Sequence, residues 1–323
     1  MQLGVGTRPP YALFMPLIVT GTVGIDTVYT PDHGHRENVL GGSCTYFAAA
    51  ASFYCKPVRV VAAVGDDFPD ELRQTMEKFE GVDHSGLEVR KGSKTFRWGG
   101  KYMENMDQRE TLYTDLGVLA EEPPAVPEAF RDSKYVFLAN THPSVQAGLL
   151  EQLPERTLSV ADTMDLWIDT AQPELTQLCE KIDGLVLNFD EAEQLTGKRN
   201  TVAAARHIIE MGPKFVVVKK GEHGCIIVHR DGIAALPAYP TENVVDPTGA
   251  GDSFAGGMMG ALAREGDSGV DPTSFAAIHR AVAHGTVVAS YNIESFSLDR
   301  LSNLSPEALE KRYNEFAAMV RFG

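Results

Sequence analysis

The chain has 323 residues, of which 43% are hydrophobic, so it can bury the core of one large α/β domain or of two smaller ones, and a disordered chain is excluded. Its formal net charge of −15 argues against a general nucleic-acid-binding protein, which would need a basic surface to displace counterions from the phosphate backbone. The cysteines lack the spacing of a metal site, so we expect small buried residues in a reducing cytosol: Cys44, Cys55, Cys179 and Cys225.

The sequence has no apolar run near the roughly 20 residues that a membrane helix needs. Residues 1–14 lack the basic start and the cleavage site of an export signal, so we expect an N-terminal extension followed by a domain spanning residues 15–323. These features predict a cytoplasmic protein that binds neither membranes nor nucleic acid.

The first β-rich run, residues 16–23, ends close to Asp26. Ligands of open α/β sheets collect at the carboxyl ends of strands, so Asp26 is placed to accept hydrogen bonds from substrate hydroxyls; an Asx turn explains the residue equally well. Further on, Gly41, Gly42 and Ser43 precede an alanine-rich helix. The paired glycines either bring a ligand close to the backbone or simply turn the chain.

Extended pieces within residues 27–40 and 94–114 predict a small sheet inserted into the large domain. A sheet hinged at the edge of a domain makes a natural lid, which keeps water away from a reacting group. One of its strands carries Arg97 and Trp98 among several aromatic residues. Packing explains most aromatic strands, and the alternative is that Trp98 stacks on a base or on a sugar face.

From residue 135 onward, strands and helices alternate at short intervals, which predicts a mostly parallel, doubly wound sheet with helices on both faces. Asn140 and Asp162 follow two of these strands and are candidates to line a site. Asn188 and Glu191 end another strand and begin a helix. Their spacing is typical of a helix cap, and it also suits an amide and a carboxylate that hold a hydrated Mg²⁺.

Residues 214–220 form the next predicted strand, and a glycine turn follows it. Lys220 and Gly221, ahead of Gly224, offer positive charge and open backbone to a nucleotide.

The stretch Val244–Leu262 reads VVDPTGAGDSFAGGMMGAL, which predicts a strand, a glycine turn and a buried helix. The glycines let the free N–H groups of the first helical turn point at an anion, and the helix dipole adds to the attraction. Asp252 would repel a static phosphate, so the pattern suggests phosphoryl transfer in which Asp252 takes the proton from an attacking hydroxyl. The alternative is that Asp252 only caps the helix and the glycines only turn the chain. A Walker A ending is absent, and Phe254 stands where a dinucleotide fingerprint has glycine or alanine.

The segment DPTGAGDSFAGG resembles the C-terminal signature of the ribokinase-like, or PfkB, family of carbohydrate and nucleoside kinases. The resemblance extends over the chain from about Met15 and implies an α/β, ribokinase-like fold with a small β-sheet lid. It also implies that Asp252 is the catalytic base and that the backbone of Gly249, Ala250 and Gly251 forms the anion hole for the transferred phosphate.

The resemblance further implies that Asp26 and the Gly41-Gly42 pair hold the substrate. Where many members have an asparagine that contacts the substrate, this chain has Tyr46, so the usual sugar contacts do not carry over whole. The complete set of candidate substrate residues is Asp26, Gly41, Gly42, Ser43, Tyr46, Arg97, Trp98 and Asn140.

Asn188 and Glu191 match the family's Asn-x-x-Glu motif, which governs magnesium and phosphate handling, with Glu191 acting on Mg²⁺ through water. Asp246 and Thr248 match the positions flanking a monovalent cation, usually K⁺. The other candidate ATP contacts are Lys220, Gly221, Gly224, Thr248, and Ala283 with Val287 on a helix predicted over residues 272–290, which would wall the adenine pocket.

These observations predict an enzyme that moves the γ-phosphate of ATP to a hydroxyl of a small sugar. One alternative acceptor is a nucleoside such as adenosine, which the aromatic strand and Tyr46 favour. A second alternative is a non-catalytic sensor of sugars or nucleotides, against which the presence of Asp252 and the full glycine turn argues. Besides substrate and ATP, the expected partner is a second copy of the chain, bound through the lid.

Overall fold

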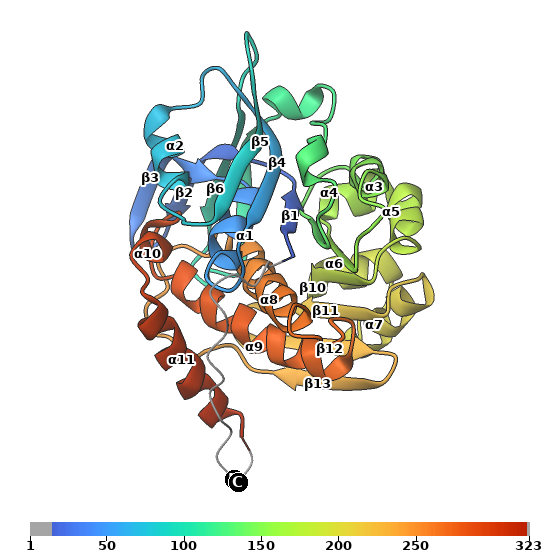
Figure 1. The fold of residues 1–323 in the computed structure, drawn as a ribbon. Helices are drawn as coiled ribbons and strands as arrows, with labels where there is room; N and C mark the ends of the chain where they lie inside the picture. Colours follow the sequence, from blue (N-terminus) through green and yellow to red (C-terminus); the bar gives the residue numbers. More distant parts are fainter. Residues whose placement is uncertain (1–14, 322–323) are drawn as a thin grey trace.

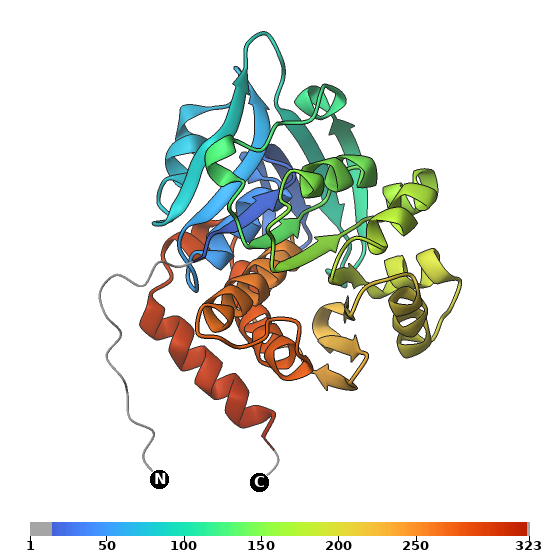
Figure 2. The same ribbon diagram turned by 45° about the vertical axis from the view of Figure 1, so that its right-hand side comes forward.

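The computed structural model describes residues 15–321, and its centre is one nine-stranded sheet (Figures 1 and 2). The neighbouring strands from β11 to β5 are parallel, whereas β12 and β13 form an antiparallel edge. In spatial order the strands are β13 (Gly232–Leu236), β12 (Cys225–His229), β11 (Phe215–Lys219), β10 (Gly184–Asn188), β9 (Leu158–Asp162), β8 (Tyr135–Leu138), β1 (Leu17–Thr20), β4 (Val58–Gly65) and β5 (Val82–Arg90).

Short, β-branched runs form these strands because both faces of the sheet are buried. In β11, Phe215 and Val217 belong to the hydrophobic cluster on one face, and Val216 and Val218 belong to the cluster on the other. The alternation places every second side chain of a strand on the same helical layer.

The helices divide into two layers according to the cluster that they complete (Figure 2). One layer holds α1 (Ser43–Ala51), α8 (Ala250–Gly266), α9 (Phe275–Asn292) and α11 (Pro306–Met319), with the shorter α2 (Asp70–Met76) and α10 (Asp299–Ser302); the other holds α3 (Pro143–Glu151), α4 (Asp165–Thr170), α5 (Gln172–Cys179), α6 (Phe189–Thr196) and α7 (Thr201–Glu210). Short 3₁₀ helices span Gly117–Ala120, Glu128–Phe130 and Gly221–His223.

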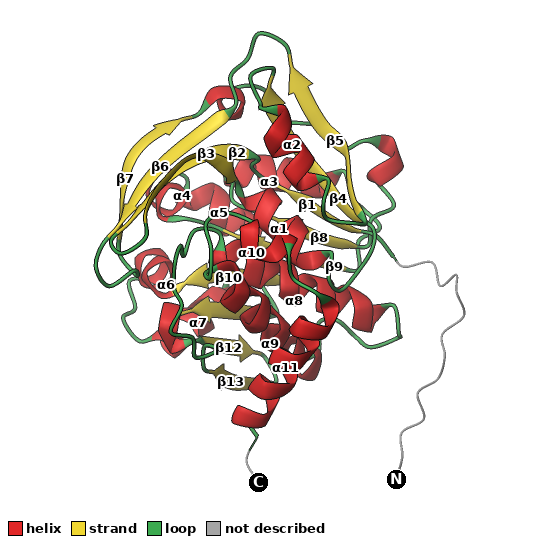
Figure 3. Cartoon of the chain, turned by 90° about the vertical axis from the view of Figure 1, so that its left-hand side faces the viewer, coloured by secondary structure: helices red, strands yellow, loops and turns green. Residues whose placement is uncertain are grey.

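A second, four-stranded sheet forms its own layer beside the large one (Figure 3). Its order is β3 (Gly34–Gly41), β2 (Gly24–Thr30), β6 (Phe96–Tyr102) and β7 (Arg109–Asp115). The outer pairs are antiparallel, but β2 and β6 are parallel. A small hydrophobic cluster, which includes Val28, Tyr102 and Phe296, joins this small sheet to the rest of the molecule.

The predicted α/β fold with a doubly wound, mostly parallel sheet and a small extra sheet is confirmed. The four cysteines are buried and unpaired, as expected. The predicted extension, residues 1–14, lies outside the described residues. Within residues 15–321, no helix combines the length and the apolar composition needed to cross a membrane.

One element differs from the prediction in a way that matters for the site. The strand expected over residues 16–23 ends at Thr20, and a separate strand begins at Gly24. Asp26 therefore lies inside the small sheet and not at the carboxyl end of a central strand. The chain passes from one sheet to the other between these strands, which a continuous β-rich run of sequence does not reveal.

Candidate active site

The glycine loop, Asp246–Asp252, leads into the N-terminus of α8 and contacts the small sheet through Thr248. Gly249 is the N-cap residue of α8, and its φ of 74° lies in the left-handed region that favours glycine. A Cβ at Gly249 would lie 2.3 Å from the ring of Tyr46. Both the backbone conformation and the packing therefore require glycine at this position.

The start of α8 offers N–H groups to an anion, because the first turn of a helix has no carbonyl of its own to bond them. The amide of Ala250 donates to the carbonyl of Pro247 at 3.1 Å. The next amides, those of Gly251 and Asp252, begin a 17-residue helix whose dipole adds partial positive charge at this end. Of the three predicted anion-hole residues, Ala250 already uses its amide within the turn.

Asp252 lies in the first turn of α8 and is partly exposed. Burial raises the pKa of its carboxyl group from 3.8 to about 6, and the positive charges of Lys219 and Arg109 oppose that rise. A carboxylate with a pKa near 6 is ionised at neutral pH and still accepts a proton readily, which suits a general base.

Two lysines precede the turn after β11, and the sequence analysis selected Lys220, whereas the structure places the ammonium group of Lys219 beside the glycine loop. A Cβ on Gly251 would lie 2.8 Å from the Nζ atom of Lys219, so the missing side chain of Gly251 leaves room for the ammonium group. Lys219 ends β11 and pairs in register with Asn188 at the end of β10. It has the same parity as Phe215 and Val217, whose side chains face the layer containing α8.

Asp162 completes the acidic part of the site at the end of β9. It is buried, and its Oδ1 atom has no hydrogen-bond partner within residues 15–321. Burial together with the charge of Asp252 raises its pKa. The ends of β9, β10 and β11 thus meet at one edge of the sheet, where ligands of open α/β folds bind.

Asn188 and Glu191 form a complete capping box at the start of α6. The Asn188 side chain accepts from the Glu191 amide at 2.8 Å, and the Glu191 carboxylate accepts from the Asn188 amide at 2.7 Å. Burial raises the pKa of Glu191, and Lys219 opposes that rise. The capping interpretation is confirmed, and a contact with hydrated Mg²⁺ stays a prediction.

Asp26, on β2, faces the paired glycines. A Cβ on Gly41 would lie 2.1 Å from the Asp26 carboxyl group. Gly42 has a φ of 95°, and a Cβ on it would lie 2.5 Å from the carbonyl oxygen of Thr22. The side chain of Asp26 is buried, yet its Oδ1 atom has no partner among the described residues. Burial raises its pKa to about 8, helped by Asp246 and Asp252 and opposed by Arg109.

The small sheet contributes three further side chains to this region. Trp98 lies beside Asp26, because the two residues pair in register between β6 and β2. Tyr102 is buried, and its hydroxyl lies 3.1 Å from the Oγ1 atom of Thr248 in the glycine loop. The guanidinium of Arg109, on β7, lies 5.6 Å from the centre of the Trp98 ring. Arg109 therefore carries positive charge from the small sheet toward Asp26 and Asp252.

Four predicted substrate residues are engaged elsewhere in this structure. Ser43 exchanges hydrogen bonds with Thr22 at 2.9–3.1 Å and is buried. Tyr46 is also buried and supports Gly249 from behind, so its ring is a wall of the glycine loop. The remaining two are Arg97, which donates to Asn38 at 3.0 Å, and Asn140, which accepts from Trp167 at 2.8 Å.

The alternation of side chains along β6 explains why Arg97 points away from the glycine loop. Trp98 and Tyr102, two steps of two residues apart, both belong to the cluster that faces the glycine loop. Arg97 has the opposite parity and therefore points to the other face of the small sheet. The structure does not favour a substrate contact for this side chain.

The predicted nucleotide residues lie around the end of β11 and on α9. Gly221 and Gly224 have φ values of 54° and 81°, and a Cβ on Gly224 would lie 2.0 Å from a backbone carbonyl oxygen. Lys220 is half-buried beside them. Ala283 is half-buried on α9, but Val287 has no exposed surface and packs in the core, so the structure does not favour a contact between Val287 and adenine.

The sequence analysis missed Lys219 and Arg109, and only one of the two left a usable signal. Counting parity along β11 selects Lys219 as the lysine on the α8 side. Arg109 is exposed at the start of an edge strand, and its position depends on the register of β6 and β7, which the sequence does not specify.

Comparison with protein families decides the class. The family described as "pfkB family carbohydrate kinase" matches this chain over residues 21–302. The chain belongs to this family. The resemblance noted in the glycine loop is thereby confirmed, and with it the assignment as an ATP-dependent phosphotransferase.

The pfkB-family chain is similar to several kinases of known acceptor. It is 31% identical over 257 residues to the cytidine kinase of Thermococcus kodakarensis, covering 77% of this chain and 89% of that one. It is 29% identical over 238 residues to the nucleoside kinase of Methanothermobacter thermautotrophicus, covering 72% and 74% of the two chains.

Solved structures agree on the fold. The nucleoside kinase of Methanocaldococcus jannaschii, an archaeal member of the ribokinase family, superimposes with a TM-score of 0.74 at 18% identity, over 93% of this chain and 98% of that one. The ribokinase of Arabidopsis thaliana, solved with ribose and ATP, gives a TM-score of 0.74 at 20% identity, over 93% and 99% of the two chains. At such identities the similarity establishes the ribokinase-like fold.

Proposed function

We propose that this pfkB-family kinase phosphorylates a hydroxyl of a nucleoside, with a simple sugar as the second candidate. One observation carries the choice: Asp26 pairs in register with Trp98, and its buried carboxyl group has an oxygen without a hydrogen-bond partner among the described residues. A carboxylate suits the paired hydroxyls of a ribose, and an indole ring beside it suits a base. The similarity to cytidine and nucleoside kinases supports this choice over the small sugar that the sequence alone placed first.

In the proposed reaction, Asp252 accepts the proton of the attacking hydroxyl while the oxygen of that hydroxyl forms its bond to the γ-phosphorus of ATP. The bond between that phosphorus and the β–γ bridging oxygen breaks, and ADP leaves. The amides of Gly249 and Gly251, together with the ammonium group of Lys219, stabilise the negative charge on the transferred group. Phosphoryl transfer depends mainly on such positioning and charge stabilisation.

Mg²⁺ is proposed to enter with ATP. Within the described residues, no group of three or more His, Cys, Asp or Glu side chains could hold a metal ion by itself, so phosphate oxygens would supply most ligands. Burial raises the pKa of Asp162 and of Glu191, and a cation bound nearby would favour the ionised form of both carboxyl groups. Mg²⁺ would neutralise phosphate charge, with Glu191 reaching it through water.

A monovalent cation, with K⁺ as the candidate, is proposed beside Asp246. The Oδ1 atom of Asp246 accepts from the Thr248 amide at 2.9 Å, but its Oδ2 atom is buried and has no hydrogen-bond partner in the part of the chain that the structure describes. Burial raises the pKa of Asp246, and its contacts with Thr248 oppose that rise. An unsatisfied buried carboxylate oxygen is a suitable ligand for a cation of this kind.

We also propose that two copies associate through the small sheet. Every residue of β7 is exposed, and its outer edge is unpaired in the sheet order. Leu112 and Tyr113 on this strand are 46% and 39% exposed, which is unusual for large apolar side chains. Light scattering after size exclusion, on the parent and on Leu112→Lys, tests the dimer.

A cytoplasmic location is inferred from the use of ATP and the four unpaired cysteines.

An acceptor panel tests the proposed function. Cytidine, uridine, adenosine, inosine and D-ribose are each supplied with ATP and Mg²⁺, and ADP release is measured under initial-rate conditions. We expect the highest kcat/KM with one of the nucleosides. A higher value with ribose would establish the sugar assignment, and binding of a nucleoside or sugar without ADP release from any acceptor would support a sensor.

A further inference from the structure

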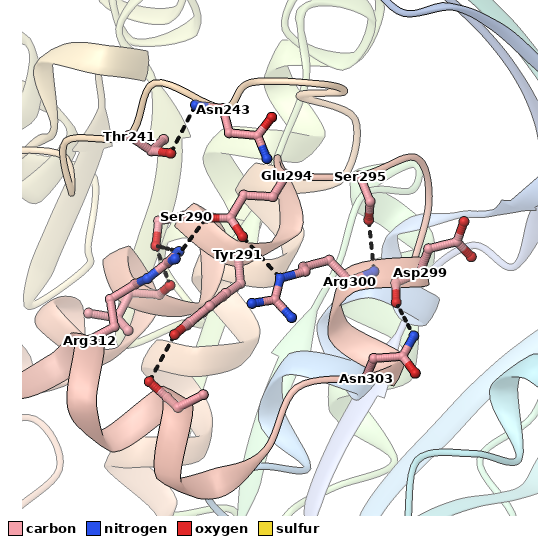
Figure 4. Close-up of polar contacts among 12 residues, drawn as sticks. Thr241, Asn243, Ser290, Tyr291, Glu294, Ser295, Asp299, Arg300, Asn303 and Arg312 are labelled. Carbon is pink, nitrogen blue, oxygen red and sulfur yellow. Dashed lines mark hydrogen bonds and ion pairs between the residues drawn. The ribbon is translucent and has the colours of Figure 1, made fainter.

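A buried ion cluster lies just after the end of α9 (Figure 4). The carboxylate of Glu294 accepts from Arg300 at 3.0 Å and from Arg312 at 2.7 Å. Only 10% of the Glu294 side chain is exposed, and 15% of that of Arg312. Ion pairs this well shielded from water are costly to break from one side, because the remaining charge is left without a partner.

Arg312 ties three elements together at this point. Its guanidinium lies 3.4 Å from the ring centre of Tyr291 and 4.8 Å from that of Tyr239, and it donates to the hydroxyl of Ser290 at 3.1 Å. Since Arg312 comes from α11 and Tyr291 from α9, the cluster fixes the C-terminal helix against the end of α9. The hydroxyl of Tyr291 adds a bond of 2.8 Å to a carbonyl in α11.

The segment that begins at the end of α9, Asn292–Ser297, holds the glycine loop from behind. The carbonyl of Ile293 accepts from the amides of Val245 and Asp246 at 2.7 and 3.2 Å. The Asn292 side chain donates to the carbonyl of Thr248 at 2.8 Å. Glu294 therefore follows directly after the residues that fix the beginning and the middle of the loop.

The same segment also reaches the substrate side of the site. Ser297 is buried and has a φ of 53°, in the left-handed region that serine rarely adopts. Its hydroxyl donates to the carbonyl of Leu40, the residue before Gly41, at 2.5 Å. A strained, buried conformation persists only where the surroundings hold it in place. The ion cluster, three residues earlier, provides such an anchor.

We propose that Glu294 is a positioning residue for phosphoryl transfer. Held between Arg300 and Arg312, it fixes the Asn292–Ser297 segment and, through that segment, the glycine loop. In this way α11, which contributes no residue to the site, sets the geometry of the amides that face the transferred phosphate. The proposal rests on the role proposed above for the glycine loop.

The test compares two ion pairs on the same layer of helices. Glu294→Gln keeps the shape of the side chain and removes its charge. The matched control is Glu265→Gln, because Glu265 is also largely buried and pairs with Arg280 at 2.6 Å between α8 and α9. Glu265 lies 13 residues after Asp252 on α8, which places it roughly 20 Å from the loop. Unfolding temperatures are measured first, and activity is assayed well below both.

For Glu294→Gln we expect kcat to fall by about 10- to 100-fold, because small displacements of catalytic groups have effects of this size, with KM for ATP and for the acceptor within about threefold of the parent. The control should keep kcat within about twofold, since an ion pair this far from the glycine loop contributes to stability and not to the geometry of the loop. A kcat for folded Glu294→Gln equal to that of the control would overturn the proposal.

A milder variant decides the question if Glu294→Gln does not fold. Arg300→Gln removes one of the two ion pairs, from a side chain that is 36% exposed. We expect a fall in kcat of roughly 3- to 10-fold with unchanged KM, and a parental kcat would refute the proposal. Asp252→Asn is assayed in parallel. If that variant stays active, the proposed mechanism fails; if it is inactive while the Glu294 and Arg300 variants are normal, only the positioning role fails.

Discussion

The two halves of the candidate site are built from different materials. The half around the glycine loop uses backbone amides and tightly packed glycines, as at Gly249, where no Cβ fits. The half on the small sheet uses side chains, Asp26 and Trp98, brought together by strand register. Backbone in a fixed turn presents the same groups to any ligand, whereas side chains on a sheet change with single substitutions. The first half therefore defines a reaction, and the second selects an acceptor.

The largest effect is expected at Asp252, in the half of the site around the glycine loop. Asp252→Asn should lower turnover by about 10²-fold or more, because the amide cannot accept the proton of the attacking hydroxyl. ATP binding, measured by calorimetry, should stay close to that of the parent. The parent's kcat/KM should also fall below a pH of about 6, where the Asp252 carboxyl group becomes protonated.

The fall in kcat/KM below about pH 6, the acid limb of the pH profile, also tests whether Asp252 is the general base. If Asp252→Asn keeps the parental turnover, or if the limb near pH 6 persists unchanged in that variant, Asp252 is not the base.

The second largest effect is expected at Gly249, with Gly34 on the small sheet as the matched control. Both have φ near 75–80°, but a Cβ at Gly34 meets no atom within 4 Å, whereas one at Gly249 would meet the ring of Tyr46. Gly249→Ala should lower kcat by about 10-fold or more and destabilise the fold by roughly 2–5 kcal/mol, from backbone strain plus overpacking.

Gly34→Ala should cost only the strain, about 1–2 kcal/mol by chemical denaturation, with kcat unchanged. Equal losses of kcat in the two variants would show that the glycine loop has no special requirement for backbone geometry.

Sequence and structure agree best where the signal is local. The chain from Asp246 to Asp252 carries its turn, its cap and its acid within seven residues, so the turn and the helix start could be predicted. The strand predicted just before this turn was wrong, because the chain from the end of β13 to α8 has no regular secondary structure. The capping box of Asn188 and Glu191 is local in the same sense. The alternation of strands and helices from residue 135 was also enough to predict a sheet with helices on both faces.

Contacts between distant segments could not be predicted in this way. Arg109 comes close to Trp98 through the pairing of β6 with β7, whose register shifts between Gly99 and Gly100. Tyr46 was expected at the substrate and instead supports Gly249, more than 200 residues away in the chain. Such packing depends on the folded core, and no short pattern encodes it.

A substitution at Asp26 distinguishes the two halves of the site, because it should change acceptor binding and not ATP binding. Asp26→Asn should raise KM for the acceptor by about 10- to 100-fold, because the amide replaces one of the two carboxyl oxygens that accept from substrate hydroxyls, and leave KM for ATP nearly unchanged. A comparable change in both KM values would mean that Asp26 does not belong to the acceptor half.

The same substitution that weakens acceptor binding should stabilise the ligand-free protein at high pH. The pKa of Asp26 is about 8 in the folded protein and 3.8 ordinarily, so the folded state holds an extra proton between these values. Its contribution to stability is fully present below about pH 4 and is lost as the pH rises toward 8. Asp26→Asn should therefore raise the unfolding temperature of the ligand-free protein at pH 8 by a few degrees, and much less at pH 5. Equal shifts at the two pH values would contradict the raised pKa.

Trp98 gives the smallest effect and the finest distinction. If its ring lies against the base of a nucleoside, Trp98→Ala should raise the nucleoside KM by about 2- to 10-fold, as expected for one lost aromatic contact, and leave KM for ribose unaffected. Trp98→Phe should restore most of the nucleoside affinity, because a flat ring remains beside Asp26. Equal changes for nucleoside and ribose would instead assign Trp98 to packing beneath Arg109, whose guanidinium already lies against one side of the ring, and the base would then have to bind elsewhere on the small sheet.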